Sequence, residues 1–252
     1  MVKKVCFTIL FSILFSTVLF AESGAEFILN SHFSAAINGD PKYIIKQNNL
    51  STEYKDKTQI GFDSGASVQF GYMFQVANNF GISVLGELGY SYNTFAGFYN
   101  VDASKDQLGI GNQLDGRIYY NTHNLISGAV LKFNIHKYAI GLGFGSLTPL
   151  GLDKTFENET LRNAIGNKST AIYSGIYTKL TFDYSIYLTE KFALNLGLYS
   201  ALNYSLKNAT TVIDDTSEQG NLILESKLLS YDVGIQVGLR FAPQLSSSAN
   251  NN

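Results

Sequence analysis

Eight stretches of the chain alternate between apolar and polar residues. In GASVQFGYMFQVANNFGISVLGELGYSY, residues 65–92, the even-numbered positions are mostly bulky and apolar, whereas the odd-numbered positions are mostly small or polar. A period of two residues is typical of β-strands whose two faces differ. This stretch holds parts of two strands. The eight predicted strands cover residues 27–37, 60–76, 80–92, 125–135, 138–144, 172–188, 192–202 and 231–241.

The connections between these strands alternate in length. Short turns are predicted at residues 77–79, 136–137 and 189–191, and long polar segments at about 38–58, 93–116, 147–169 and 205–227. The prolines, Pro41, Pro149 and Pro243, all lie between the alternating stretches, as expected for residues that cannot donate to a sheet ladder. The pattern predicts an up-and-down meander whose short turns lie at one end and whose long loops lie at the other.

The composition of the two faces indicates which one points inward. A soluble, lipocalin-like barrel would bury the apolar face, but an eight-stranded barrel is only just wide enough to be filled by side chains. Phe, Tyr and Leu at nearly every apolar position would overfill it, whereas the Gly, Ser, Asn and Gln of the other face would fit. We therefore predict an all-β, eight-stranded antiparallel transmembrane barrel with short periplasmic turns and four long extracellular loops.

The first residues, MVKKVCFTILFSILFSTVLFAES, predict a secretory signal peptide over residues 1–21. Lys3 and Lys4 precede an apolar run of 16 residues, and Ala21 is a small residue at the expected cleavage site. The alternative is a transmembrane anchor, which needs about 20 residues. Cys6 lies within this segment, so no disulfide is expected in the mature chain. The barrel is predicted over residues 22–241 and a polar tail over 242–252.

Charge excludes some partners. The formal net charge is −2 and no long basic run exists, so no nucleic acid is expected to bind. Neither a metal site nor a cofactor is predicted.

The signal peptide, eight amphipathic strands, three tight turns and four long loops resemble the small bacterial outer-membrane barrels of the OmpA/OmpX and opacity-protein type. The resemblance covers about residues 25–241 and rests on pattern rather than on a motif. It implies a monomer in the bacterial outer membrane, in contact with outer-membrane lipid and inserted by the assembly machinery. Such proteins commonly end in an alternating strand with a terminal Phe that this machinery reads. YDVGIQVGLRF has this form, with Phe241 as the assembly signal, although the tail APQLSSSANNN follows it.

Few charges lie on the predicted lumen face, and they form the candidate site. Glu87, Lys179, Asp183 and Asp232 lie at about mid-height, with His32 nearby on the first strand. Because the first and last strands close the barrel, His32 and Asp232 are expected to approach each other. A buried charge needs a partner, so the set predicts a polar network of ion pairs that fills the lumen. The alternative is a gated narrow conductance in which Lys179 exchanges acidic partners.

No catalytic site is predicted. The chain resembles lipid A deacylases in size, but their catalytic histidine has a serine two residues on, whereas His123 is followed by Asn124 and Leu125, and His136 lies at a turn. The long loops are rich in polar residues, and they form either a binding surface, for instance for host surface or serum proteins, or a merely solvated one. We expect a structural, adhesin or antigen role. The alternatives are a narrow ion channel, a lipid-modifying enzyme and a soluble periplasmic barrel.

Overall fold

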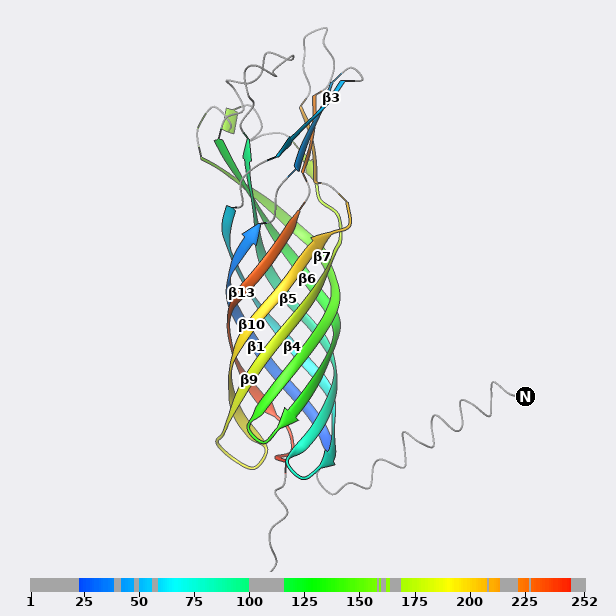
Figure 1. Cartoon of the computed structure of the whole chain (residues 1–252), viewed down its shortest axis with the longest axis vertical. Helices are drawn as coiled ribbons and strands as arrows, with labels where there is room; N and C mark the ends of the chain where they lie inside the picture. The colour runs from blue at the N-terminus through cyan, green and yellow to red at the C-terminus, as the bar shows by residue number, and fades with distance from the viewer. Residues whose placement is uncertain are drawn as a thin grey trace, which may run out of the picture.

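Eight long antiparallel strands form a closed barrel (Figure 1). The computed structural model describes residues 23–38, 42–47, 50–55, 59–99, 116–157, 159, 162–163, 169–207, 209–213, 222–226 and 228–245. The barrel strands are β1 (Gly24–Asn38), β4 (Gln59–Ala77), β5 (Phe80–Tyr99), β6 (Gly116–Ile135), β7 (Tyr138–Phe156), β9 (Gly175–Tyr187), β10 (Phe192–Ser205) and β13 (Leu229–Phe241). Each pairs with the next along the chain once the loop strands are set aside, and β1 pairs with β13 to close the ring. The predicted fold class is confirmed.

The bulky apolar side chains point away from the barrel axis. Phe70 is 56% exposed and Phe144 is 67% exposed, whereas Gln69 beside Phe70 is 1% exposed and faces the lumen. Exposing this surface to water would cost about 25 cal/mol of free energy per Å² of apolar area, whereas contact with lipid hydrocarbon avoids that cost. The polar-in, apolar-out arrangement is therefore that of a membrane-spanning barrel and is the reverse of a soluble one. Among the residues described, no helix is long and apolar enough to cross a membrane.

Short turns join β4 to β5 and β6 to β7 at the periplasmic end. Asn79 and His136 have positive φ angles, 59° and 55°, which let the chain reverse within two residues. The His136 backbone N–H donates to the Asn79 carbonyl oxygen at 2.9 Å, so the two turns brace each other.

The barrel wall rises further on the loop side than the sequence predicted. β5 and β6 each contain 20 residues, and their pairing continues to Tyr99 and Gly116. β7 likewise runs on to Phe156, although its loop was expected to begin at residue 147. The apolar alternation ends where lipid ends, but a hydrogen-bonded ladder does not need apolar side chains and continues in water.

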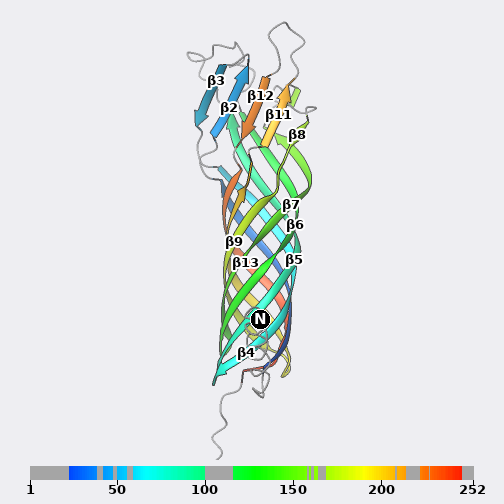
Figure 2. The same cartoon turned by 90° about the vertical axis from the view of Figure 1, so that its right-hand side faces the viewer.

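A second sheet of five strands stands above the barrel at the loop end (Figure 2). Its order is β3-β2-β12-β11-β8, and three different loops contribute. The strands are β2 (Lys42–Gln47), β3 (Leu50–Lys55), β8 (Thr170–Ala171), β11 (Ala209–Ile213) and β12 (Leu222–Ser226). This sheet was not predicted, because its strands are short and pair across segments far apart in the chain, such as Ile44 with Glu225.

The first residues of the predicted tail turn back against the periplasmic end of the barrel. The Ala242 N–H donates to the Lys191 carbonyl oxygen at 3.0 Å, and Ala242 and Leu245 are both buried. Leu245 lies against β5, since a Cβ on Gly81 would be 2.9 Å from its Cδ2. The predicted signal peptide and residues 246–252 lie outside the described residues.

Candidate functional site in the barrel lumen

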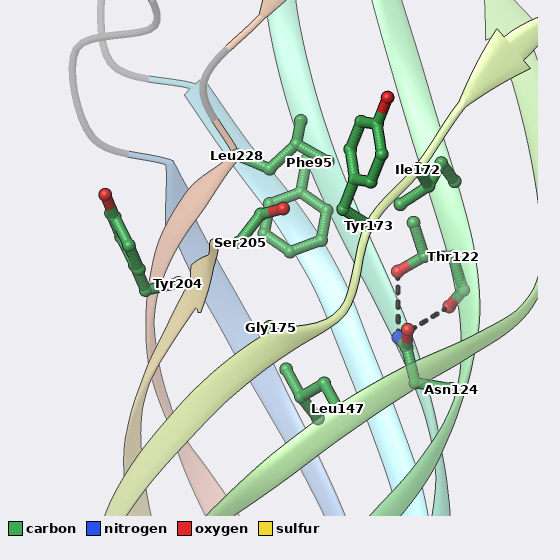
Figure 3. Close-up of a pocket in the computed structure, with 10 residues that line it drawn as sticks. All are labelled: Phe95, Thr122, Asn124, Leu147, Ile172, Tyr173, Gly175, Tyr204, Ser205 and Leu228. Atoms are coloured by element: carbon green, nitrogen blue, oxygen red, sulfur yellow. Dashed lines mark hydrogen bonds between the residues drawn. The ribbon is translucent and has the colours of Figure 1, made fainter. Parts of the chain in front are cut away.

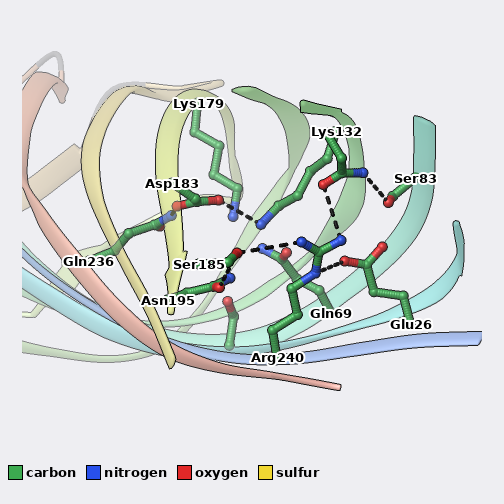
Figure 4. Close-up of polar contacts among 12 residues, drawn as sticks. Glu26, Gln69, Ser83, Lys132, Lys179, Asp183, Ser185, Asn195, Gln236 and Arg240 are labelled. Carbon is green, nitrogen blue, oxygen red and sulfur yellow. Dashed lines mark hydrogen bonds and ion pairs between the residues drawn. The ribbon is translucent and has the colours of Figure 1, made fainter. Parts of the chain in front are cut away.

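Three buried ion pairs lie inside the described part of the barrel, and Figure 4 shows several of their members. They are Lys179 with Glu87, Lys132 with Asp183, and Arg240 with Glu26. No side chain among these six is more than 8% exposed. Buried charges are stable only when they are paired and hydrogen-bonded, and each pair is supported by further polar neighbours.

Glu87 and Lys179 form the ion pair nearest the loop end, and several neighbours donate hydrogen bonds to Glu87. Its carboxylate contacts the Lys179 ammonium and accepts hydrogen bonds from Tyr177 Oη at 2.6 Å, Ser67 Oγ at 2.7 Å and Gln69 Nε2 at 3.1 Å. The donors come from β4 and β9, whereas Glu87 is on β5. This carboxylate therefore links β5 to its neighbour β4 and, across the lumen, to β9.

Lys132 and Asp183 form the next pair toward the periplasm. Lys132 Nζ lies 2.8 Å from Asp183 Oδ2, and Asp183 Oδ1 also accepts from Gln236 Nε2. Lys132 is the largest fully buried side chain among those described. Its ammonium has given up its hydration, so it depends on Asp183 for stability.

Arg240 forms the pair nearest the periplasmic turns. Its Nε donates to Glu26 Oε1 at 2.7 Å, and its other nitrogens lie 3.2 Å from Asn134 Oδ1 and 3.5 Å from Ser185 Oγ. Arginine suits this position because its planar fork holds several acceptors at once.

The expected approach of His32 to Asp232 is wrong. In the closing pair β1–β13, His32 is opposite Gln236, and Asp232 is opposite Ala36. His32 instead stacks on Tyr199, with ring centroids 4.4 Å apart. The alternation of residues sets the face on which a side chain lies, but it does not set the register between strands.

Asp232 belongs to a separate polar cluster closer to the loops. It accepts from Asn203 Nδ2 at 2.6 Å, and the carboxyl group of Asp63 lies near enough to interact with it electrostatically. Asp63 in turn accepts from Asn93 Nδ2 and from the Thr94 backbone N–H, both at 2.7 Å. Of the five residues predicted for the network, all face the lumen, but only Glu87 and Lys179 pair with each other.

Four further charged residues face the lumen that were not predicted to belong to the network. Glu26, Asp63, Lys132 and Arg240 are all buried. A signal was present for three of them, because Glu26, Lys132 and Arg240 each lie between two outward-facing apolar neighbours, as Lys132 does between Leu131 and Phe133. Asp63 lies between Phe62 and the polar Ser64, so the pattern marks it less clearly.

A small pocket lies near the loop end of the barrel (Figure 3). Phe95, Leu147, Tyr173 and Leu228 line it, and Asn124 Nδ2 donates to Thr122 Oγ1 at 2.9 Å at one side. Its volume of about 20 Å³ holds little more than one water molecule, so it is no ligand site as it stands.

His123 lies on the outer face of β6, outside the lumen. Its Nδ1 is 2.5 Å from Tyr90 Oη and its Nε2 is 3.1 Å from Asp153 Oδ2. The exposed cluster lies at the level where the lipid-facing surface gives way to the loops. Among the described residues, no group of three or more His, Cys, Asp or Glu side chains is placed to hold a metal ion.

Phe241, the predicted assembly signal, lies on the lipid-facing side at the periplasmic end. Its ring contacts Phe192 and Phe27, with centroid distances of 4.7 Å and 6.4 Å. Its role in assembly stays a prediction.

The closed barrel, the apolar outer face and the polar lumen define a small bacterial outer-membrane β-barrel protein. Residues 7–242 match the family model described as "Domain of unknown function (DUF2715)", and the chain belongs to this family. No curated protein matches the sequence.

Several solved outer-membrane proteins are similar to this chain. The chain is similar to the outer membrane protein OprG from Pseudomonas aeruginosa, with 14% identity over 86% of this chain and 97% of that one, and a TM-score of 0.45. It is also similar to the outer membrane protease OmpT from Escherichia coli, with 9% identity over 85% and 96% of the two chains and a TM-score of 0.40. For Ail, the attachment invasion locus protein of Yersinia pestis, the identity is 13%, the coverage 84% and 98%, and the TM-score 0.25.

Proposed function

We propose that this protein is a non-catalytic surface protein that uses its extracellular five-stranded sheet to bind a macromolecule outside the cell. The observation that carries the proposal is the sheet itself. Segments from three loops pair in a defined register, including Tyr43 with Ser226 and Thr210 with Ala171. A solvated surface without a role would not need this order, because ordering backbone costs about 1–2 kcal/mol per residue.

The barrel supplies a rigid base for this sheet. Binding residues are most often found on loops that a rigid scaffold positions. Here the four strands β4 to β7, with 19 or 20 residues each, carry the scaffold beyond the lipid-facing band. The sheet is thereby held away from the membrane surface, where an extracellular partner can reach it.

The test compares bacteria that display the wild-type protein with bacteria that display a variant lacking half of the sheet. Residues 42–55 would be replaced by a Gly/Ser linker of equal length, and binding to immobilised host matrix and serum proteins would be measured. We expect binding to fall to the level of cells without the protein. A replacement of residues 101–114, a segment of equal length from the second predicted loop, serves as control. Equal binding by wild type and the sheet variant, with both displayed at equal level, would contradict the proposal.

The tight packing of side chains in the lumen argues against the alternative function, a channel. Gln69, Lys132 and Asp183 are each no more than 1% exposed, so the lumen at their level is filled by side chains rather than open to bulk water. An ion would have to break charged hydrogen bonds to pass.

We therefore expect no single-channel steps from the wild-type protein in planar bilayers. The Glu87→Ala/Lys179→Ala double variant removes a complete pair and leaves no unpaired charge, and it is expected to produce brief openings. The Lys137→Ala variant in a periplasmic turn controls for preparation. Regular conductance steps from the wild type would favour the channel function instead.

A further inference from the structure

The barrel wall has a notch at its periplasmic end, where the first and last strands meet. β13 ends at Phe241, which pairs with Phe27 on β1, but β1 extends three residues further, to Gly24. After Phe241 the strand pairing with β1 ends: the Ala242 N–H donates to the Lys191 carbonyl oxygen beside β10, and the Pro243 ring lies against Gly24 at the end of the notch. The resulting cavity has a volume of about 790 Å³, within the range of small-molecule sites.

One side of the notch offers backbone hydrogen-bonding groups. Gly24, Ala25 and Glu26 pair with Met73, Tyr72 and Gly71 of β4 along one edge. Along the other edge, the register with β13 begins only at Phe27, so these three residues have no strand partner there among the described residues. Unpaired amide groups at a sheet edge can hold an anion.

The other sides of the notch are aromatic and basic. Phe27, Phe70 and Phe241 line it, and all three belong to the lipid-facing surface. Lys191 borders it from the turn between β9 and β10 and is exposed. The neighbouring Glu190 is not among the lining residues, and the carboxylate of Glu26 is buried, with its Oε1 accepting from Arg240 Nε.

We propose that the notch is a binding site for an anionic phospholipid of the periplasmic leaflet. The acyl chain lies along Phe27 and Phe70, and the phosphate contacts the Lys191 ammonium and the free edge of β1. The site is continuous with the lipid-facing surface, so a membrane lipid reaches it without leaving the bilayer. A soluble anion would gain from Lys191 but would leave the aromatic side uncovered.

The test uses tryptophan fluorescence, because the sequence contains no tryptophan. The full mature chain carrying Phe70→Trp would be refolded into phosphatidylcholine vesicles that contain brominated phosphatidylglycerol or, in parallel, brominated phosphatidylcholine. Brominated acyl chains quench only a tryptophan that they contact. One lysine near a lipid phosphate is worth about 1 kcal/mol, so we expect phosphatidylglycerol to be preferred about five-fold at this reporter. Lys191→Gln should remove the preference.

Two controls separate the site from ordinary lipid contact. A Tyr138→Trp reporter lies on β7 at the same end of the barrel but away from the notch, and it should show no preference. Lys137→Gln removes a different lysine of the periplasmic turns and should leave the preference at Phe70→Trp intact. Heat-modifiable gel migration verifies that every variant is folded. Equal preference at both reporters, or a preference that survives Lys191→Gln, would overturn the proposal.

Discussion

Replacing Lys132 by methionine is expected to lower the free energy of unfolding by about 3–5 kcal/mol. The substitution keeps the volume of the side chain nearly constant and removes its charge. Among the described residues, Asp183 then has no cation at hydrogen-bonding distance, and the Gln236 side chain is the one that still donates to it. Urea unfolding of the barrel in lipid vesicles measures the loss.

The double variant Lys132→Met/Asp183→Asn distinguishes an unpaired charge from lost packing. It removes both charges, so we expect it to recover most of the stability that the single variant loses. Lys137→Met changes an exposed lysine near the same strand end and should alter stability by less than about 0.5 kcal/mol. A single variant as stable as wild type would show that Lys132 does not carry a charge in the folded barrel.

A second large effect is expected from Gly234→Ala on the lumen face of β13. A Cβ at this position would lie 2.0 Å from the Phe33 carbonyl oxygen and 2.5 Å from Ser34 Cα on β1. Both contacts are with backbone, so the closing strands must separate. Overpacking of this kind costs about 1–3 kcal/mol or more. We expect less folded, heat-modifiable protein after refolding and a lower unfolding midpoint in urea.

Gly86→Ala is the matched control on β5. The atoms nearest to its Cβ belong to the Phe70 ring, at 3.3 Å or more, and that side chain can turn toward lipid. Since alanine also restricts the unfolded chain, this variant should equal or slightly exceed wild-type stability. If the two variants behaved alike, the close contact between β1 and β13 would not limit closure of the barrel.

The candidate site could be predicted only in outline. The five residues singled out from the alternating pattern do face the lumen, because the face of a strand residue follows from its position alone. Their partners could not be inferred in this way. Lys132 and Asp183 are 51 residues apart, and Arg240 and Glu26 are 214 apart. Which of them meet depends on how far each strand is shifted against its neighbours.

The extracellular sheet is a second feature whose strand partners could not be predicted from the local sequence pattern. The pattern that reveals the barrel strands comes from the contrast between lipid and lumen, and the segments outside the membrane lack this contrast. β2 and β12 pair across about 180 residues of the chain, as Ile44 does with Glu225, and no local feature of either strand indicates the other. Only the closed barrel brings their parent loops together.

The sequence by itself determined the number of barrel strands, the end at which the long loops lie, and the face that meets lipid. These properties follow from local alternation and from the cost of placing a side chain in the wrong solvent, which acts on each residue separately. The tertiary structure alone decided the register, the three ion pairs, the sheet above the barrel and the notch where β13 ends before β1. These depend on how the ring closes, and ring closure is a property of all eight strands together.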